Sequence, residues 1–137
     1  MTQTRISAAL RREVRERARE RCEYCLLAES QVFDPHEPDH LIALQHGSET
    51  SSANLALACF DCNRLKGTNI ASLDPLTGEL VALFNPRTQR WSEHFKLNGS
   101  TIIPLTSVGR ATERMLGLNL SVRVEARERW TTLGLYP

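Results

Sequence analysis

The chain has 137 residues, 17 Lys and Arg against 16 Asp and Glu, and a net charge of +1, a size that suits one domain with a modest core. No apolar run approaches the roughly 20 residues that span a bilayer, and the first residues lack the apolar core of a signal peptide. We therefore expect a cytoplasmic protein with no membrane partner.

Charge is distributed unevenly along the chain. Residues 22–62 contain seven acidic residues and no Lys or Arg, whereas residues 1–21 contain seven Arg and residues 63–137 contain ten basic residues. Basic segments around a site are typical of proteins that bind nucleic acid, although Arg-rich helices are as often simply solvated.

The first predicted element is a helix over residues 8–21, with Ser7 as its N-cap. Leu10, Val14 and Ala18 recur every four residues and form one apolar stripe that should pack on the core. The arginines of the other faces should point to water or to DNA phosphates, and the pattern does not choose between the two: Arg11, Arg12, Arg15 and Arg19.

Two Cys-x-x-Cys pairs follow, 33 residues apart, and they contain all four cysteines: Cys22, Cys25, Cys59 and Cys62. In a reducing compartment, two such pairs favour a metal site over disulfides. Zn²⁺ binds four thiolates in a closed tetrahedron, so the sequence predicts a structural zinc site. A redox pair is the alternative, but its usual βαβ context is absent.

A strand, loop, strand and helix are predicted between and after these pairs. The first strand should start at Asp39 and include Leu41, Ile42 and Leu44, followed by a polar loop over residues 45–53. Residues 55–58 suit a second strand paired with the first. A short helix should begin near Phe60 and end at Gly67.

Within this segment, Asp39-His40 comes first, Asn54 lies in the middle, and Asn63 directly follows the second cysteine pair. This order resembles the HNH endonuclease family, in its variant with asparagine at the third position. The resemblance covers roughly residues 20–97 well and the last 40 residues weakly. It implies an α+β fold with a zinc-stapled ββα-metal nuclease centre, an N-terminal helix, and a small C-terminal antiparallel sheet with helices.

The resemblance also implies the chemistry. His40 would be the general base that accepts a proton from water, and Asp39 and Asn63 would hold one catalytic Mg²⁺ or Mn²⁺ ion. Asn54 would hold the loop through backbone hydrogen bonds and orient the base. Asn63 replaces the histidine that the family often carries, which favours an oxygen-loving ion over catalytic zinc.

Residues 74–137 are expected to extend a core at about residues 20–73, within a single domain over residues 1–137. Strands are predicted at residues 79–84, 91–97 and 101–105, and helices at residues 108–118 and 121–133. On the last helix, a stripe should face the core: Val122, Ala126, Trp130 and Leu133. Trp91, Phe95 and Trp130 are assigned to the core rather than to base stacking.

The predicted function is metal-dependent endonuclease cleavage of DNA. DNA contact should fall mainly on Arg64 and Lys66, with help from arginines of the flanking helices, while His36 and His46 are either phosphate contacts or surface residues. Two alternatives stay open: a zinc-stabilised nucleic-acid-binding module without catalysis, and a structural or partner-binding subunit.

Overall fold

The computed structural model describes residues 5–137. Helix α1, Ala8–Arg17, begins where Ser7 Oγ accepts a hydrogen bond from the backbone N–H of Leu10 at 3.1 Å. It ends four residues before the predicted end, because Arg19 and Glu20 adopt positive φ angles of 55° and 59°. No helix in the described part of the chain is long and apolar enough to cross a membrane.

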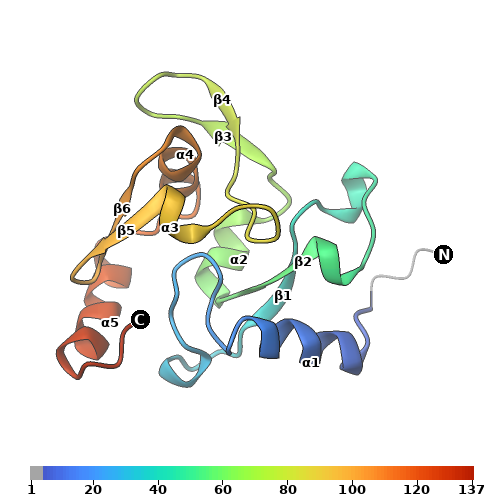
Figure 1. Ribbon diagram of the computed structural model, residues 1–137, viewed down its shortest axis with the longest axis horizontal. Helices are drawn as coiled ribbons and strands as arrows, with labels where there is room; N and C mark the ends of the chain where they lie inside the picture. The colour runs from blue at the N-terminus through green and yellow to red at the C-terminus, as the bar shows by residue number, and fades with distance from the viewer. Residues whose placement is uncertain (1–4) are drawn as a thin grey trace.

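The predicted order of strand, loop, strand and helix is present. Strand β1, Glu37–His40, pairs antiparallel with β2, Leu55–Ala58, and helix α2, Phe60–Lys66, follows directly. In this register Asp39 lies opposite Ala56, and His40 lies opposite Leu55. Figure 1 shows α2 near the centre of the molecule, between the β1–β2 pair and the C-terminal elements.

The first strand begins and ends earlier than predicted, and the side chain of Asn54 explains the early end. Asn54 accepts a hydrogen bond from the N–H of Ile42 and donates to the carbonyl oxygen of the same residue, both at 2.9 Å. The backbone at Ile42 therefore bonds to a side chain instead of to a neighbouring strand. Two short 3₁₀ helices, Leu44–His46 and Ser52–Asn54, lie in the loop, and a third, Glu29–Gln31, precedes β1.

Strand β2 is buried on both faces. Leu55 and Leu57 pack with Val14 of α1 and with Ile6, whereas Ala56 and Ala58 belong to the larger cluster that contains the four cysteines. Successive side chains of a strand point to opposite faces, so one strand contributes to both clusters. Because other elements pack on both faces of β2, none of its side chains is exposed, and its sequence Leu-Ala-Leu-Ala is apolar throughout.

The chain after Gly67 contains two strand pairs and three helices rather than one small sheet. Strands β3, Ala71–Leu73, and β4, Leu80–Ala82, form a hairpin that projects from one end of the molecule (Figure 1). Helix α3, Trp91–His94, leads into β5, Phe95–Asn98, which pairs with β6, Thr101–Pro104. Helices α4, Ser107–Met115, and α5, Ser121–Thr132, complete the fold.

One prediction in the extension is wrong in detail. The strand predicted over residues 91–97 is helical until His94, and its first aromatic residue, Trp91, turns inward to donate from Nε1 to the carbonyl oxygen of Tyr24 at 2.8 Å. Phe95 is in the core as predicted. The strand β3 was not predicted, and it pairs with β4 in a short hairpin.

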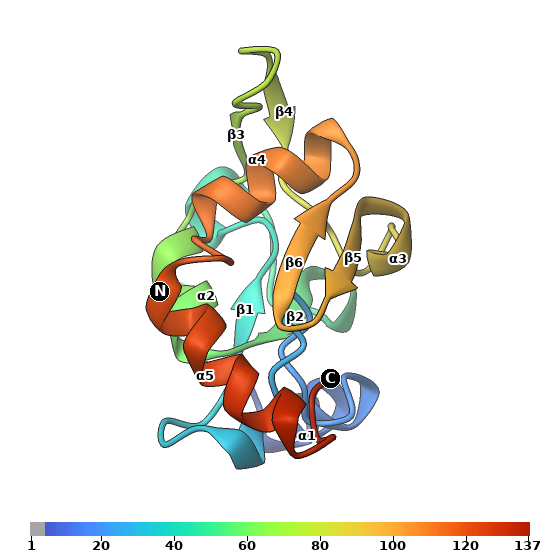
Figure 2. The same cartoon turned by 90° about the vertical axis from the view of Figure 1, so that its left-hand side faces the viewer.

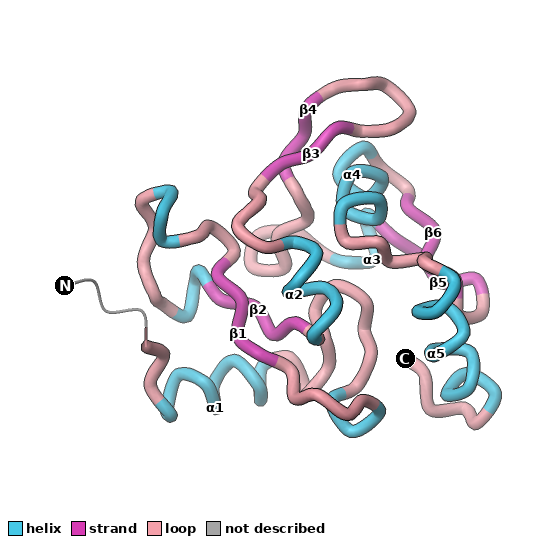
Figure 3. The backbone as a smooth tube through the Cα atoms, turned by 180° about the vertical axis from the view of Figure 1, so that it is seen from behind, coloured by secondary structure: helices cyan, strands magenta, loops and turns pink. Residues whose placement is uncertain are grey.

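On helix α5 the predicted stripe faces the core only in part, since Ala126 and Trp130 are half-buried. Val122 and Leu133 are 69% and 66% exposed, whereas Arg123 and Arg127 are buried. Figure 2 shows α5 running along the outside of the molecule, and Figures 1 and 3 show it on the side opposite α1. The two buried arginines find polar partners inside, and those partners decide which face turns inward.

Candidate functional site

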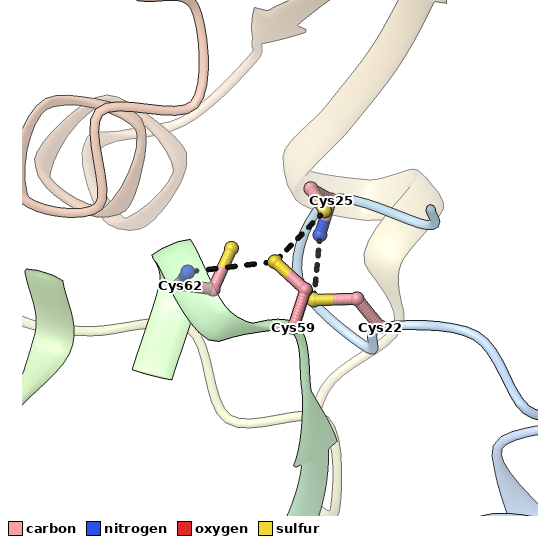
Figure 4. A group of neighbouring side chains, drawn as sticks. All are labelled: Cys22, Cys25, Cys59 and Cys62. Carbon is pink, nitrogen blue, oxygen red and sulfur yellow. Dashed lines mark hydrogen bonds between the residues drawn. The ribbon is translucent and has the colours of Figure 1, made fainter. Parts of the chain in front are cut away.

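The four cysteines form one buried cluster. Cys22 and Cys25 lie in the turn after α1, Cys59 caps the start of α2, and Cys62 lies in its first turn (Figure 4). Their sulfur atoms all lie within 4.8 Å of one another, and none is in a disulfide. Segments 33 residues apart in the sequence are thus joined at one point, as the spacing predicted.

Backbone N–H groups point at two of these sulfurs. Cys22 Sγ accepts from the N–H groups of Tyr24 and Cys25, and Cys59 Sγ accepts from the N–H of Cys62, each at 3.4 Å. Burial raises the pKa of the Cys22 and Cys62 thiols, whereas the hydrogen bond with Cys22 lowers the pKa of Cys25. The donor set fits a closed, structural zinc site.

Asp39 lies beside this cluster and is almost fully buried, at 6% exposed. Its Oδ2 atom accepts a hydrogen bond from the hydroxyl of Tyr24 at 3.1 Å and lies 3.0 Å from the ammonium nitrogen of Lys66. Burial raises the pKa of Asp39, against the opposing effect of the nearby Lys66 charge. Asp39, Tyr24 and Lys66 therefore form a buried polar triad.

His40 follows Asp39 on β1 and is half-buried, with its ring next to the loop that joins β1 to β2. Its Nε2 atom lies 2.9 Å from the hydroxyl oxygen of Thr50 in that loop. Its carbonyl oxygen accepts a hydrogen bond from Nζ of Lys66 at 3.0 Å. Lys66 thus contacts both members of the Asp39-His40 pair.

Asn54 holds the loop closed. Besides its two bonds to Ile42, its Nδ2 atom donates to the carbonyl oxygen of Glu49 at 2.8 Å. Glu49 immediately precedes Thr50, the residue that contacts the ring of His40. The buried amide therefore fixes the segment against which the histidine rests.

Asn63 lies on α2, half-buried, one residue after the last cysteine. Its backbone continues the helix by accepting from the N–H of Gly67 at 2.9 Å. Within residues 5–137, its side chain makes no hydrogen bond to Asp39 or His40. The structure thus groups Asp39, His40 and Asn54 around β1 and its loop, with Asn63 on the helix that packs against both strands.

Sequence reasoning missed three residues of this site: Tyr24, Thr50 and Lys66. Lys66 was predicted to contact DNA, and that prediction is wrong, because its side chain is only 2% exposed and is bonded to Asp39 and His40. One signal was available, since Lys66 follows Asn63 by three residues and therefore shares its helix face. Tyr24 and Thr50 gave no such signal.

Two of the four arginines predicted to face water or phosphates, Arg11 and Arg15, instead pair with carboxylates of the protein, and Arg17 also bonds to the rest of the fold. Arg15 bonds through Nε and Nη2 to Glu29 at 2.9 and 3.0 Å, and Arg17 donates to the carbonyl oxygen of Leu55 at 2.8 Å. Arg11 pairs with Glu37 on β1 at 2.8 Å. These three side chains attach the helix to the rest of the fold, whereas Arg12 and Arg19 are exposed, as predicted.

Helix α2 presents an aromatic residue and a cation on its outer surface. Phe60 is 54% exposed, and the guanidinium carbon of Arg64 lies 5.9 Å from the centre of its ring. Arg64 is itself exposed and makes only a loose ion pair with Asp61, at 3.7 Å. Of the two residues predicted to make most of the DNA contact, Arg64 is exposed and Lys66 is not.

Comparison with known proteins identifies the same segment. Residues 22–69 match the family model described as HNH endonuclease. The matched range begins at the first cysteine and includes all four, together with Asp39, His40, Asn54 and Asn63. No curated protein and no solved structure matches the chain.

Proposed function

We propose that this chain, which carries an HNH endonuclease domain at residues 22–69, is a metal-dependent endonuclease that hydrolyses phosphodiester bonds in DNA. In this proposal His40 is the general base, Asp39 and Asn63 bind the catalytic ion, and Asn54 holds the loop that positions the base. The four cysteines bind one structural Zn²⁺.

The contact between His40 and Thr50 is the observation that carries the proposal. In the tautomer in which Nε2 donates to Thr50, Nδ1 carries a lone pair that can accept a proton from water. Asn54 fixes the backbone of the preceding residue, so the ring is held in one orientation. A half-buried histidine held this way suits the role of a general base.

The residues assigned to the catalytic ion fit it in the chemistry of their donors. The carboxylate of Asp39 and the amide oxygen of Asn63 are hard ligands of the kind that Mg²⁺ and Mn²⁺ prefer. Since Tyr24 and Lys66 both contact Oδ2 of Asp39, Oδ1 is the atom that would bind the ion. When bound, such an ion stabilises charge on the leaving oxygen of the phosphodiester.

For the DNA contact we propose Arg64 together with the exposed ring of Phe60. A guanidinium can bond a phosphate with two nitrogens, and an exposed aromatic ring can rest against the sugar or a base. Both residues lie on the helix that carries Asn63. The proposed contact and the proposed catalytic ligand thus share one element.

One observation favours the second candidate, a zinc-stabilised nucleic-acid-binding module without catalysis. The charge of Asp39 is already compensated by Lys66, so the carboxylate does not need a metal ion to be stable inside the protein. A domain that had lost catalysis could keep this ion pair for its stability alone.

The deciding experiment is incubation of purified protein with supercoiled plasmid and Mg²⁺ or Mn²⁺, with EDTA as the control. Metal-dependent nicking that is lost in a His40→Ala variant supports the nuclease. DNA binding without nicking, at any concentration of either metal, supports the binding module instead. His46→Ala is the matched control, because His46 is an exposed histidine that bonds to the carbonyl oxygen of Thr68 away from the triad.

A further inference from the structure

Arg123 of helix α5 reaches the cysteine cluster from outside the HNH segment. Its Nη2 atom lies 2.9 Å from Sγ of Cys62 and 3.7 Å from Sγ of Cys59, and the residue is only 6% exposed. It lies 61 residues after Cys62 in the sequence. Figure 2 shows the helix that carries it passing beside α2.

The guanidinium is held in place by other contacts. Its Nη1 atom donates to the carbonyl oxygens of Leu116 and Gly117 at 2.6 and 3.2 Å, at the end of α4. Its Nε atom lies 3.8 Å from the carboxylate of Asp61, which is half-exposed. The two backbone carbonyls and the carboxylate thereby orient the planar guanidinium toward the sulfurs.

A buried guanidinium needs a negative partner, because an unpaired charge in the interior costs several kcal/mol. Asp61 lies 3.8 Å away and is partly hydrated, so the buried sulfur of Cys62, at 2.9 Å, is the closest compensating group. Four thiolates around one Zn²⁺ carry a net charge of −2. A charge-assisted hydrogen bond from Arg123 would offset part of this charge where water is excluded.

We propose that Arg123 is an outer-sphere partner of the four-cysteine metal site, which raises its affinity for metal and lowers the reactivity of its thiolates. This inference depends on the proposed zinc site and is independent of nuclease activity. Outer-sphere hydrogen bonds of this kind change metal affinity by about 10- to 100-fold. It makes the C-terminal helix part of a metal centre whose four ligands all lie in residues 22–69.

Arg127 supplies a matched control on the same helix. It lies one turn later, is equally buried, and donates to the carbonyl oxygen of Ser100 at 2.8 Å and to Asn119 at 3.3 Å. Within residues 5–137 its hydrogen bonds go to oxygen atoms and not to sulfur. Arg127→Met therefore removes a buried guanidinium from α5 without removing a contact to the metal ligands.

The test measures Zn²⁺ affinity by competition with a chromophoric chelator, and the rate of cysteine alkylation, in the full chain. We expect Arg123→Met to weaken Zn²⁺ binding by about 10- to 100-fold and to accelerate alkylation. Arg127→Met should keep wild-type affinity even if its melting temperature falls. Arg123→Lys keeps the charge, guards against a variant that fails to fold, and should lose less affinity than Arg123→Met.

Two results would overturn the inference alone: wild-type affinity in both Arg123 variants, or equal losses in Arg123→Met and Arg127→Met, which would trace the effect to helix packing. A wild-type protein that binds no Zn²⁺ would overturn both this inference and the proposed zinc site. Absence of plasmid cleavage has no bearing on either outcome, because neither readout uses DNA.

Discussion

The ammonium nitrogen of Lys66 lies 3.0 Å from Oδ2 of Asp39 and donates to the carbonyl oxygen of His40, also at 3.0 Å. One buried cation therefore contacts the side chain of the proposed metal ligand and the backbone of the proposed base. It fixes β1 at the point where the two residues diverge to opposite faces. It also places a positive charge where a second cation would have to bind.

Replacing Lys66 with Met should have two effects. The uncompensated Asp39 carboxylate should lower the free energy of unfolding by about 3–5 kcal/mol, the usual cost of breaking a buried ion pair. In the protein that still folds, nicking should reach half its maximal rate at a lower Mg²⁺ concentration, because the competing charge is gone. Chemical denaturation and a metal titration check the two effects. Lys96→Met, at an exposed lysine, is the control, and a Lys66→Met protein as stable as wild type would contradict the burial argument.

Replacing His40 with Ala should lower the nicking rate by about 10²- to 10⁴-fold, the usual contribution of a general base, and excess metal should not restore it. Asp39→Asn should also lower the rate, but excess Mn²⁺ should restore part of it, because this change weakens metal binding and not proton transfer. Asn63→Ala should resemble Asp39→Asn in a milder form, since a neutral amide contributes less. Nicking rates measured against metal concentration separate these cases. Full activity of His40→Ala would show that another group is the base.

Removing the structural metal should destabilise the whole domain. Metal binding and folding are coupled in such sites, so Cys62→Ser should contain well below one Zn²⁺ per chain and melt at a clearly lower temperature. Elemental analysis and circular dichroism measure the two quantities. Wild-type protein treated with a strong chelator should behave like the variant, and recovery on adding Zn²⁺ is the control. A metal-free protein with an unchanged melting temperature would rule out a stapling role.

Replacing Arg64 with Ala should weaken DNA binding and reduce its dependence on salt. Each phosphate contact releases bound counterions, so the slope of log affinity against log salt should become shallower by about one. Fluorescence anisotropy across a salt series gives this slope. Arg17→Ala is a useful comparison, because Arg17 is tied to the carbonyl oxygens of Ser52 and Leu55 and should affect stability more than the salt slope. Equal slopes for wild type and Arg64→Ala would exclude the proposed contact.

The ion pair between Asp74 and Arg110 should make the stability of the protein depend on pH in acid. Its carboxylate accepts hydrogen bonds from Arg110 at 2.8 and 2.9 Å, and these bonds hold the pKa of Asp74 below its usual value of about 3.9. Because the folded pKa is depressed, this contribution to stability is complete above about pH 4 and is lost as the pH falls toward the folded value. Asp74→Asn should therefore melt below wild type at pH 7, and the difference should shrink in more acidic buffer. A difference that does not change with pH would assign the effect to packing.

The parts of this fold that the sequence predicts correctly depend on residues close together or on fixed spacings. The two cysteine pairs predict that their segments lie together in the fold, because four sulfurs that bind one cation must be close to one another. The strand–loop–strand–helix order follows from local patterns around Asp39 and Asn63. Asn54 could be assigned to the loop from the sequence. The end of β1 at His40, however, depends on hydrogen bonds between the Asn54 side chain and Ile42, and a hydrophobic pattern cannot predict such bonds.

The parts that were missed depend on partners distant in the sequence. A lysine on a short helix is normally exposed, and only the position of Asp39 explains why Lys66 is inside. An apolar stripe shows that one face of a helix is more hydrophobic than the others, but it does not show that this face packs on the core. On α5 two residues of the stripe, Val122 and Leu133, are exposed, because Arg123 and Arg127 have sulfur and carbonyl partners on the inner side.

Strand β2 has a consequence for how the protein loses its structure. Its leucines belong to the cluster under α1, and its alanines belong to the cluster around the cysteines, so neither cluster can open without exposing one face of the same four residues. The two halves should then melt as one cooperative unit rather than in sequence. The β3–β4 hairpin has no such shared strand, and the ion pair between Asp74, which follows β3, and Arg110 of α4 joins it to the rest of the molecule.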